Sequence, residues 1–568
     1  MPLNIGDFKP RFLDPNADLG DPSVAKQWYD TLETRTLGSI SALEAWLGDW
    51  SEVDAWLDEE ASVRYVESTC QTDDPAREKR YLDFIENVSP VIKSCSDRLN
   101  RKLLACDHVS ALPKDRYEVF LRAIRNQVAL FREANIPLQT EDEKLRQQYQ
   151  KLVGCMTVLH DGREQTLDEM GRYQEEQDRA ARQETWEKVN EPWRAARDAI
   201  DQIYDKMVEL RQQMARNAGF KDYRDLAFAE MERFDYTPAD CEAFADTIAR
   251  VVVPAARRLG EERKAKLGVE SLRPWDMYVD IDGHPPLKPF TGAAQLMDGV
   301  GRIFTRVAPD LGEQFARMRR EGLLDLESRK GKAPGGYMMM YEGRRLPFIF
   351  MNAVGTHDDV QTMLHEGGHA FHGFAARNED MVALRDAPIE FCEVASMAME
   401  LLAGKYLDEF YSPADANRAR TEHLQETVKF FPWMACVDMI QHWVYTHAGH
   451  SRKERSHAWQ CLNTRFNHWV DYTGYEDVLA DSWHRKGHPF TVPFYYVEYG
   501  IAQLGALGVW RNSRTDHAAA VTAYRRALSL GGRRPLPELF STAGVKFDFS
   551  EATVAPLIAA AQEVCKAH

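Results

Sequence analysis

Residues 356–377 read THDDVQTMLHEGGHAFHGFAAR, and this stretch fixes how the rest of the chain is interpreted. His365 and His369 are four residues apart, so on a helix both imidazoles lie on one face, one turn apart, and can share one cation. Glu366 projects to the side, where it can reach a water on that cation without binding the cation itself. Thr356 is a candidate N-cap. The stretch therefore predicts a metal site built on a helix.

Two histidines and a glutamate at this spacing are typical of zinc peptidases, where the imidazoles bind zinc and the glutamate acts as general base. The alternative is a core helix with two buried histidines. One class of such sites takes its third ligand from a His at the position that is Ala375 here, so this chain must supply it elsewhere. Glu390, Glu393 and Glu400 are the candidates downstream, and Glu393 and Glu400 share a helix face, so that one can bind while the other supports it. The spacing does not choose among the three.

The paired glycines Gly367 and Gly368 are unfavourable inside a helix, by about 1 kcal/mol each relative to alanine. A close approach of substrate, or of another segment of backbone, would explain their presence.

The segments HEGGHAFH (365–372) and EVASMAME (393–400) resemble the thimet oligopeptidase and oligoendopeptidase F family of zinc metallopeptidases, and more closely its oligoendopeptidase F branch. The resemblance implies that Glu393 is the third zinc ligand and that Glu400 is an acid supporting the ligands. It also implies that His372 is not a ligand, and we interpret His372 as structural or supporting.

A second segment, HPFTVPFYYVEYGIAQLG (488–505), resembles the histidine and tyrosine segment of the same family. The resemblance implies that His488, Tyr496 and Tyr499 face the zinc and stabilise the tetrahedral intermediate. A tyrosine hydroxyl suits this role because it can donate to an oxyanion while it stays protonated at neutral pH. The residues leave the choice among Tyr495, Tyr496 and Tyr499 open, and aromatic packing in a core is the alternative for each.

Composition places the chain among globular proteins: 568 residues, 44% hydrophobic and 28% charged. The formal net charge of −17 argues against nucleic acid and anionic membranes as partners. Nine irregularly spaced cysteines favour free thiols in a reducing compartment. No apolar stretch is long enough for a membrane span, and the N-terminus does not read as a signal peptide. We therefore expect a cytoplasmic protein; the oligomeric state stays open.

Helical periodicity dominates the chain, and the family resemblance implies a mainly α, multi-lobed zincin with a helical shell around a deep substrate channel. Residues 1–200 are predicted to form an N-terminal helical region and residues 201–568 the catalytic region. The interval 334–352, with two apolar runs around a glycine turn, predicts a β-hairpin beside the active-site helix. Its run 348–352 is interpreted as an edge strand that an extended peptide can join.

Other intervals give smaller predictions. Glutamate- and arginine-rich residues 163–216 predict long helices, with Pro192 near a junction or first turn and a glycine stop at Gly219. Four prolines between 268 and 292 predict irregular chain. The histidines of the segment QHWVYTHAGH (441–450) are interpreted as structural.

Together these features predict a zinc-dependent oligoendopeptidase that binds one Zn²⁺ per chain and cleaves short unstructured peptides. Three alternatives remain. The first is a zinc exopeptidase, in particular a carboxypeptidase that releases dipeptides. The second is an inactive peptide-binding or zinc-storage protein, and the third is a structural helical protein with a chance motif.

Overall fold

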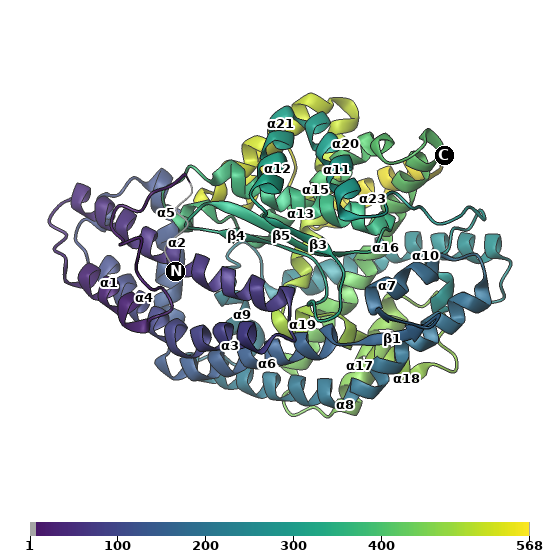
Figure 1. The fold of residues 1–568 in the computed structure, drawn as a ribbon, viewed down its shortest axis with the longest axis horizontal. Helices are drawn as coiled ribbons and strands as arrows, with labels where there is room; N and C mark the ends of the chain where they lie inside the picture. The colour runs from purple at the N-terminus through teal and green to yellow at the C-terminus, as the bar shows by residue number, and fades with distance from the viewer. Residues whose placement is uncertain (1–6, 567–568) are drawn as a thin grey trace.

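The computed structural model describes residues 7–566, and most of them are helical (Figure 1). The predicted mainly α architecture is confirmed. The first third of the chain contributes α1 (Pro22–Thr34), α2 (Ile40–Cys70), α3 (Pro75–Asp83), α4 (Ser89–Leu104), α5 (Lys114–Leu130), α6 (Ile136–Gly154), α7 (Leu167–Gly171) and α8 (Arg179–Ala218). None of the described helices is long and apolar enough to span a membrane.

The remaining helices surround the active-site region. They are α9 (Tyr223–Glu230), α10 (Pro238–Leu267), α11 (Ala293–Val307), α12 (Pro309–Arg320), α13 (His357–Ala376), α14 (Val382–Arg385), α15 (Ile389–Ala403), α16 (Pro413–Thr446), α17 (Arg452–Phe466), α18 (Glu476–Asp481), α19 (His488–Thr491), α20 (Tyr496–Thr515), α21 (His517–Leu528), α22 (Leu536–Thr542) and α23 (Glu551–Lys566). In Figure 1 the purple N-terminal helices lie at the left, and α8 runs along the lower edge.

Helix α8 confirms one sequence prediction and corrects another. It ends at Gly219, whose φ of 88° is the left-handed conformation of a glycine stop. Pro192 was expected near a junction, but it lies inside a single helix that runs on past it. The lost backbone hydrogen bond is outweighed by the packing of α8 along α6 and against the segment that follows α10.

The buried side chains form two main clusters. One joins residues between Leu13 and Ile124 and also takes in Met381 and Leu384 of α14. The other, larger cluster begins at Val66 and includes the helices that carry the metal motif. Residue 200, the predicted boundary, lies inside α8, and the division into two regions stays a prediction.

A three-stranded sheet lies beside α13. Its strands are β3 (Leu324–Glu327), β4 (Tyr337–Tyr341) and β5 (Leu346–Ala353), in the order β3-β5-β4. The predicted hairpin is confirmed by the antiparallel pairing of β4 with β5. The sequence missed β3, which is short and pairs with β5 in parallel, so it carries no hairpin signal. The edge-strand prediction for 348–352 is wrong, because β5 is the central strand with a neighbour on each side.

A second hairpin was also missed. Strands β1 (Thr157–His160) and β2 (Arg163–Thr166) pair antiparallel across Asp161 and Gly162. Both turn residues have positive φ, 52° and 72°. An Asp-Gly pair is the favoured sequence for such a two-residue turn, so this signal was available in the sequence.

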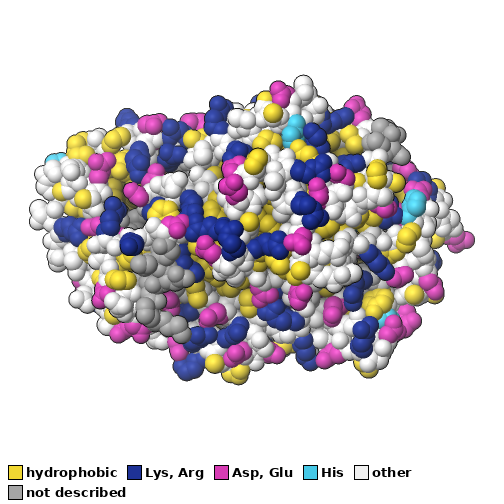
Figure 2. Space-filling view, turned by 45° about the horizontal axis from the view of Figure 1, so that its top comes forward, with side chains coloured by type: hydrophobic (Ala, Val, Ile, Leu, Met, Phe, Trp, Pro, Cys, Tyr) yellow, Lys and Arg dark blue, Asp and Glu magenta, His cyan; other side chains and the backbone are white. Residues whose placement is uncertain are grey.

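Surface charges are mixed despite the acidic total. On the face in Figure 2, Lys and Arg side chains are interspersed with Asp and Glu. In the described part of the chain, ion pairs such as Arg302 with Glu409 join opposite charges. Net charge alone therefore does not describe how this face would meet a partner.

Candidate active site

Helix α13 starts directly after β5, and its first turn is held by a reciprocal cap. The Thr356 hydroxyl accepts a hydrogen bond from the Asp359 amide, and a carboxylate oxygen of Asp359 accepts from the amides of Val354, Gly355 and Thr356 at 2.7–2.9 Å. This cap joins the end of the sheet rigidly to the helix. The two predicted histidine ligands therefore project from a fixed scaffold.

His365, His369 and Glu393 come together. Their ligand atoms all lie within 4.8 Å of one another. Glu393 Oε2 lies 3.3 Å from His365 Nε2 and 3.4 Å from His369 Nε2. Two imidazoles and one carboxylate are the donor set of a catalytic zinc site with an open fourth position. The residues therefore fit a zinc ion.

The surrounding contacts distinguish the three glutamates among which the spacing did not choose the third ligand. Glu400 Oε1 lies 2.6 Å from His365 Nδ1, so the ring donates through Nδ1 and presents the Nε2 lone pair to the ligand group. Glu390 instead accepts a hydrogen bond from the hydroxyl of Tyr236. Of the three, only Glu393 faces both histidines.

Two side chains hold Glu393 in place. The Tyr495 hydroxyl donates to Glu393 Oε1, and the Ser396 hydroxyl donates to Oε2 at 3.0 Å. Burial works to raise the pKa of Glu393, but the neighbouring His369 and His365 bring it well below its usual value. The carboxylate is therefore ionised, as a metal ligand must be.

Glu366 is buried beside the ligands and has an unused oxygen. Burial raises its pKa above the usual value, and Oε2 has no hydrogen-bond partner among the residues described. A methyl group on Gly336, just before β4, would lie 3.4 Å from Glu366 Oε1 and 3.1 Å from the Thr362 methyl. The chain before β4 thus passes close to the carboxylate, and a side chain at residue 336 would be crowded mainly by the Thr362 methyl.

The close approach of another backbone, predicted for the paired glycines of α13, is found at Gly368, whereas Gly367 makes room for a side chain. A methyl group on Gly368 would lie 2.5 Å from the carbonyl oxygen of Ala395, and one on Gly367 would lie 2.4 Å from the Phe304 ring. Gly368 lets the backbones of α13 and α15 approach closely enough for Glu393 to reach the histidines.

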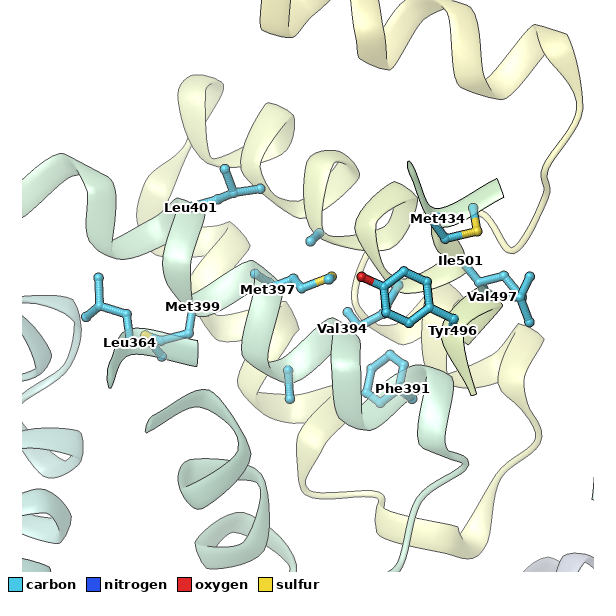
Figure 3. Packing of buried hydrophobic residues seen from close by; sticks show 14 of the residues in the cluster. Leu364, Phe391, Val394, Met397, Met399, Leu401, Met434, Tyr496, Val497 and Ile501 are labelled. Atoms are coloured by element: carbon cyan, nitrogen blue, oxygen red, sulfur yellow. The ribbon is translucent and has the colours of Figure 1, made fainter. Parts of the chain in front are cut away.

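A hydrophobic core supports these helices from behind. Figure 3 shows Phe391, Val394 and Met397 of α15 among side chains from the neighbouring helices, with Tyr496 and Val497 of α20 close by. Because interiors of this kind are close-packed, the ligand-bearing helices have little freedom to separate.

The predicted His488, Tyr496 and Tyr499 form one aromatic group. His488 Nε2 lies 3.1 Å from the Tyr499 hydroxyl, and the Tyr496 hydroxyl accepts a hydrogen bond from Trp433 Nε1 at 3.1 Å. Burial lowers the pKa of His488 to about 3 and raises that of Tyr499 well above its usual value. At neutral pH the imidazole is therefore uncharged and the phenol keeps its proton.

Phe494, just before these tyrosines, has a strained backbone with φ of 66°. Its amide donates to Gln441 Oε1 at 2.7 Å, and its carbonyl accepts from Arg233 at 2.6 Å. Arg233 is also paired with Glu498 of α20 at 2.7 Å. Arg233 and Gln441 hold the turn that brings Tyr495 to Glu393. Sequence reasoning gave neither a role: Gln441 begins the segment 441–450, where only the histidines were interpreted, and Arg233 belongs to no recognisable motif.

His372 lies outside the ligand group, as predicted. It is buried, its ring packs edge-on against Phe391 with centroids 6.1 Å apart, and burial lowers its pKa to about 3.

A cavity of about 1340 Å³ reaches the neighbours of the ligand group rather than the three ligands themselves. Thr362, Met397 and Glu400 line it, and Glu400 is the side chain bound to His365; Gly335 and Gly336 line it ahead of β4. The His365 and His369 side chains are 18% and 14% exposed, against 2% for Glu393. The histidines are therefore the more accessible part of the site.

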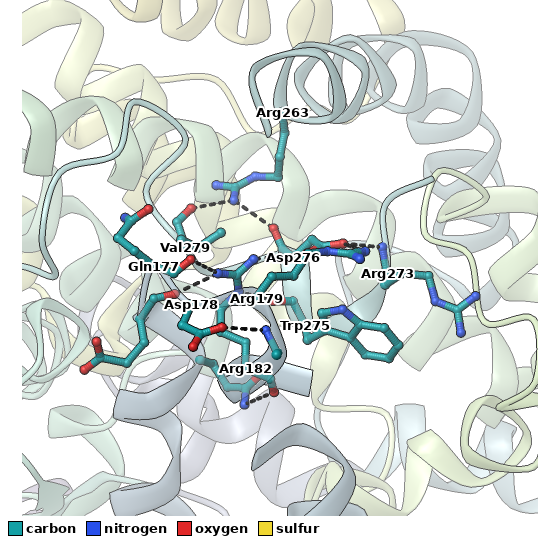
Figure 4. A network of polar contacts seen from close by, with 12 residues as sticks. Gln177, Asp178, Arg179, Arg182, Arg263, Arg273, Trp275, Asp276 and Val279 are labelled. Atoms are coloured by element: carbon teal, nitrogen blue, oxygen red, sulfur yellow. Dashed lines mark hydrogen bonds and ion pairs between the residues drawn. The ribbon is translucent and has the colours of Figure 1, made fainter. Parts of the chain in front are cut away.

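Part of the cavity wall is the proline-rich interval predicted as irregular, where a single 3₁₀ turn, Pro274–Asp276, interrupts the chain. Figure 4 shows how it is anchored: Asp276 is fully buried, accepts two hydrogen bonds from Arg179 at 2.9 and 2.7 Å, and is also bound by Arg182. Arg263 adds bonds to the carbonyls of Asp276 and Val279. The wall is thus fixed without regular secondary structure.

Comparison with known proteins decides the family. The sequence pattern of Peptidase family M3 matches residues 172–557, and that of the Peptidase M3 N-terminal domain matches residues 23–131. The chain belongs to peptidase family M3. The predicted resemblance to the oligoendopeptidase F branch is confirmed, because a curated relative and a solved structure similar to this chain are both named oligoendopeptidase F.

Among curated relatives, an oligoendopeptidase F homolog of Borreliella burgdorferi is 24% identical over 62% of this chain and 61% of its own length. Oligopeptidase PepF of Bacillus subtilis is 24% identical over 37% of this chain and 32% of its own. The matches thus span less than two thirds of either relative.

Solved structures match over the whole chain. One named as an oligoendopeptidase F is 26% identical, covers 100% of this chain and 99% of its own, and has a TM-score of 0.93. PZ peptidase A with an inhibitor is also 26% identical, with 99% of both chains covered and a TM-score of 0.91. The M3 fold is therefore shared from end to end.

Proposed function

We propose that this M3 family member is a zinc-dependent oligoendopeptidase that hydrolyses internal bonds of short unstructured peptides. The observation that carries the proposal is the convergence of His365, His369 and Glu393, with the carboxylate of Glu366 beside them. A large cavity reaches Glu400, the side chain that contacts His365. The matched donor set and the M3 family support one zinc ion per chain at this place.

When bound, zinc supplies Lewis-acid activation of water and of the scissile carbonyl. Glu366 takes the proton of the attacking water and then delivers a proton to the leaving nitrogen, and its raised pKa suits both transfers. Tyr499, kept protonated and next to neutral His488, donates to the developing oxyanion. Tyr496 is the second candidate donor, while Tyr495 is already bound to Glu393.

The sheet suggests how a peptide would lie. β5 has neighbours on both sides, whereas β4 is an edge strand, and the chain leading into it borders the cavity at Gly335 and Gly336. We propose that an extended substrate runs alongside β4, with its scissile bond over Glu366. Short unfolded chains can enter such a cavity, whereas a folded domain is too wide.

The cysteines support a reducing, cytoplasmic location. All nine are free thiols in the described structure. Disulfides are rare in such compartments and common outside them, so their absence from these residues fits this proposal.

Endopeptidase and dipeptide-releasing activities are separated by blocking substrate ends. We expect peptides that are acetylated at the N-terminus and amidated at the C-terminus to be cleaved internally, and a chelator to stop the reaction. The products are identified by mass spectrometry of a mixed peptide library with and without the chelator. Cleavage confined to peptides with a free C-terminus would favour the carboxypeptidase alternative instead.

The turn at Phe494 gives a prediction about positioning. Replacing Gln441 by Met removes the acceptor for the Phe494 amide, so we expect kcat to fall several-fold while KM and zinc content stay unchanged. The unfolding free energy should fall by about 1–3 kcal/mol.

A matched control is Gln212→Met. Gln212 is also buried and accepts from the amide of Tyr223, but unlike Gln441 it makes no hydrogen bond to the turn at Phe494. A similar loss of stability with unchanged kcat is expected there. Equal losses of kcat in both variants would mean that Gln441 acts only through stability.

A further inference from the structure

A second group of metal-binding side chains is buried outside the active site, where α10 packs against α16. Cys241, Asp438 and His442 offer ligand atoms that all lie within 4.8 Å of one another. Their exposed fractions are 1%, 1% and 4%. His442 Nε2 lies 3.3 Å from Asp438 Oδ2, the same separation as between His365 Nε2 and Glu393 Oε2 in the active site.

The polar atoms of this group lack partners. Both ring nitrogens of His442 and the Oδ1 oxygen of Asp438 have no hydrogen bond to any residue in the described part of the chain. The rings of Phe228 and Phe494 stand edge-on to His442, with centroids 5.9 and 5.3 Å away. An unsatisfied buried polar group costs about 1–3 kcal/mol, so three such atoms together need an explanation. A cation would satisfy them.

The ends of the two helices bring the three ligands together. Cys241 lies in the first turn of α10, after the cap at Thr237. Asp438 and His442 are four residues apart on one face of α16, near its C-terminal end, where positive charge is favoured.

We propose that Cys241, Asp438 and His442 bind a second, structural zinc ion that ties α10 to α16. Thiolate, imidazole and carboxylate are all zinc ligands, and a water molecule would complete the tetrahedron. On binding, the Cys241 thiol proton is released to solvent, and thiolate plus carboxylate neutralise the divalent charge. Because His442 packs on Phe494, the ion would also support the turn that carries Tyr495.

Cobalt substitution tests the site directly, since the active-site ligands contain no sulfur. Full-length protein is stripped with a chelator under reducing conditions and reloaded with Co²⁺ or Zn²⁺. We expect about two ions per chain and a thiolate-to-cobalt charge-transfer band in the near ultraviolet. Cys241→Ala should abolish the band and reduce the content to about one ion per chain.

Two controls make the result specific. Cys436→Ala removes another fully buried thiol of α16 that is not in the group, and it should keep the band. His365→Ala with His369→Ala should also keep the band, so failure of the proposed active site is distinguished from failure of this one. If Cys241→Ala does not fold, His442→Ala and Asp438→Asn test the remaining ligands.

The metal content and the absorption spectrum of the wild-type protein test the proposal without any variant. About one ion per chain after saturating reloading, with no thiolate band, would overturn the proposal. So would a band that survives Cys241→Ala.

Discussion

Glu366→Gln is expected to lower kcat/KM by at least about 100-fold while the protein keeps its zinc. The amide has nearly the same shape as the carboxylate but cannot accept the proton of the attacking water. Because Glu366 faces the ligands without binding them, His365, His369 and Glu393 are left intact. Peptide hydrolysis rates and zinc content per chain are measured on the same preparation.

The matched control is Glu426→Gln, which removes a carboxylate that lines the cavity and is paired with Lys429 instead of the predicted ligands. It is expected to keep its activity within a few-fold of the wild type. A Glu366→Gln variant with bound zinc and nearly wild-type turnover would contradict the general-base role.

Glu393→Ala is expected to lose zinc, and with it all chelator-sensitive activity. Removing the carboxylate leaves two imidazoles, which are too few ligands for a stable catalytic zinc site. Glu400→Gln should retain zinc but bind it about 10–100-fold more weakly, because its bond to His365 Nδ1 orients that ligand. Glu390→Gln should leave zinc affinity unchanged, since Glu390 is bound to Tyr236 instead.

Zinc affinity is measured by competition with a chromogenic chelator, and thermal unfolding checks that each variant is folded. The decisive result is the order of the losses in zinc affinity: complete in Glu393→Ala, partial in Glu400→Gln and none in Glu390→Gln. If Glu390→Gln or Glu400→Gln lost zinc as completely as Glu393→Ala, the ligand assignment would be wrong.

Local sequence patterns were enough for the elements whose signal lies within a few residues. The spacing of His365 and His369 predicted two imidazoles on one helix face, and the apolar runs around Gly343 predicted the β4–β5 hairpin. Patterns failed where partners lie far apart in sequence. Strand β3 is an example, because its pairing with β5 depends on a crossover that its own four residues do not encode.

The order of strands in the sheet shows the same limit. An apolar run at 348–352 fits a central strand as well as an edge strand, because both present hydrophobic side chains. Only the parallel neighbour β3 makes β5 the central strand, and β4 is then an edge strand. The proposed substrate path therefore runs alongside β4 instead of β5.

By itself the sequence predicted the metal motif, the general base and the mainly helical fold, because each prediction rests on residue types at short, regular spacing. Only the tertiary structure separated Glu393 from Glu390 and Glu400, since all three lie on one helix and the packing of α13, permitted by Gly368, decides which faces the histidines. It also brought Arg233 and Gln441 to Phe494 and Cys241 to His442. Such contacts join residues from 53 to 261 positions apart, and they arise from packing that no local pattern records.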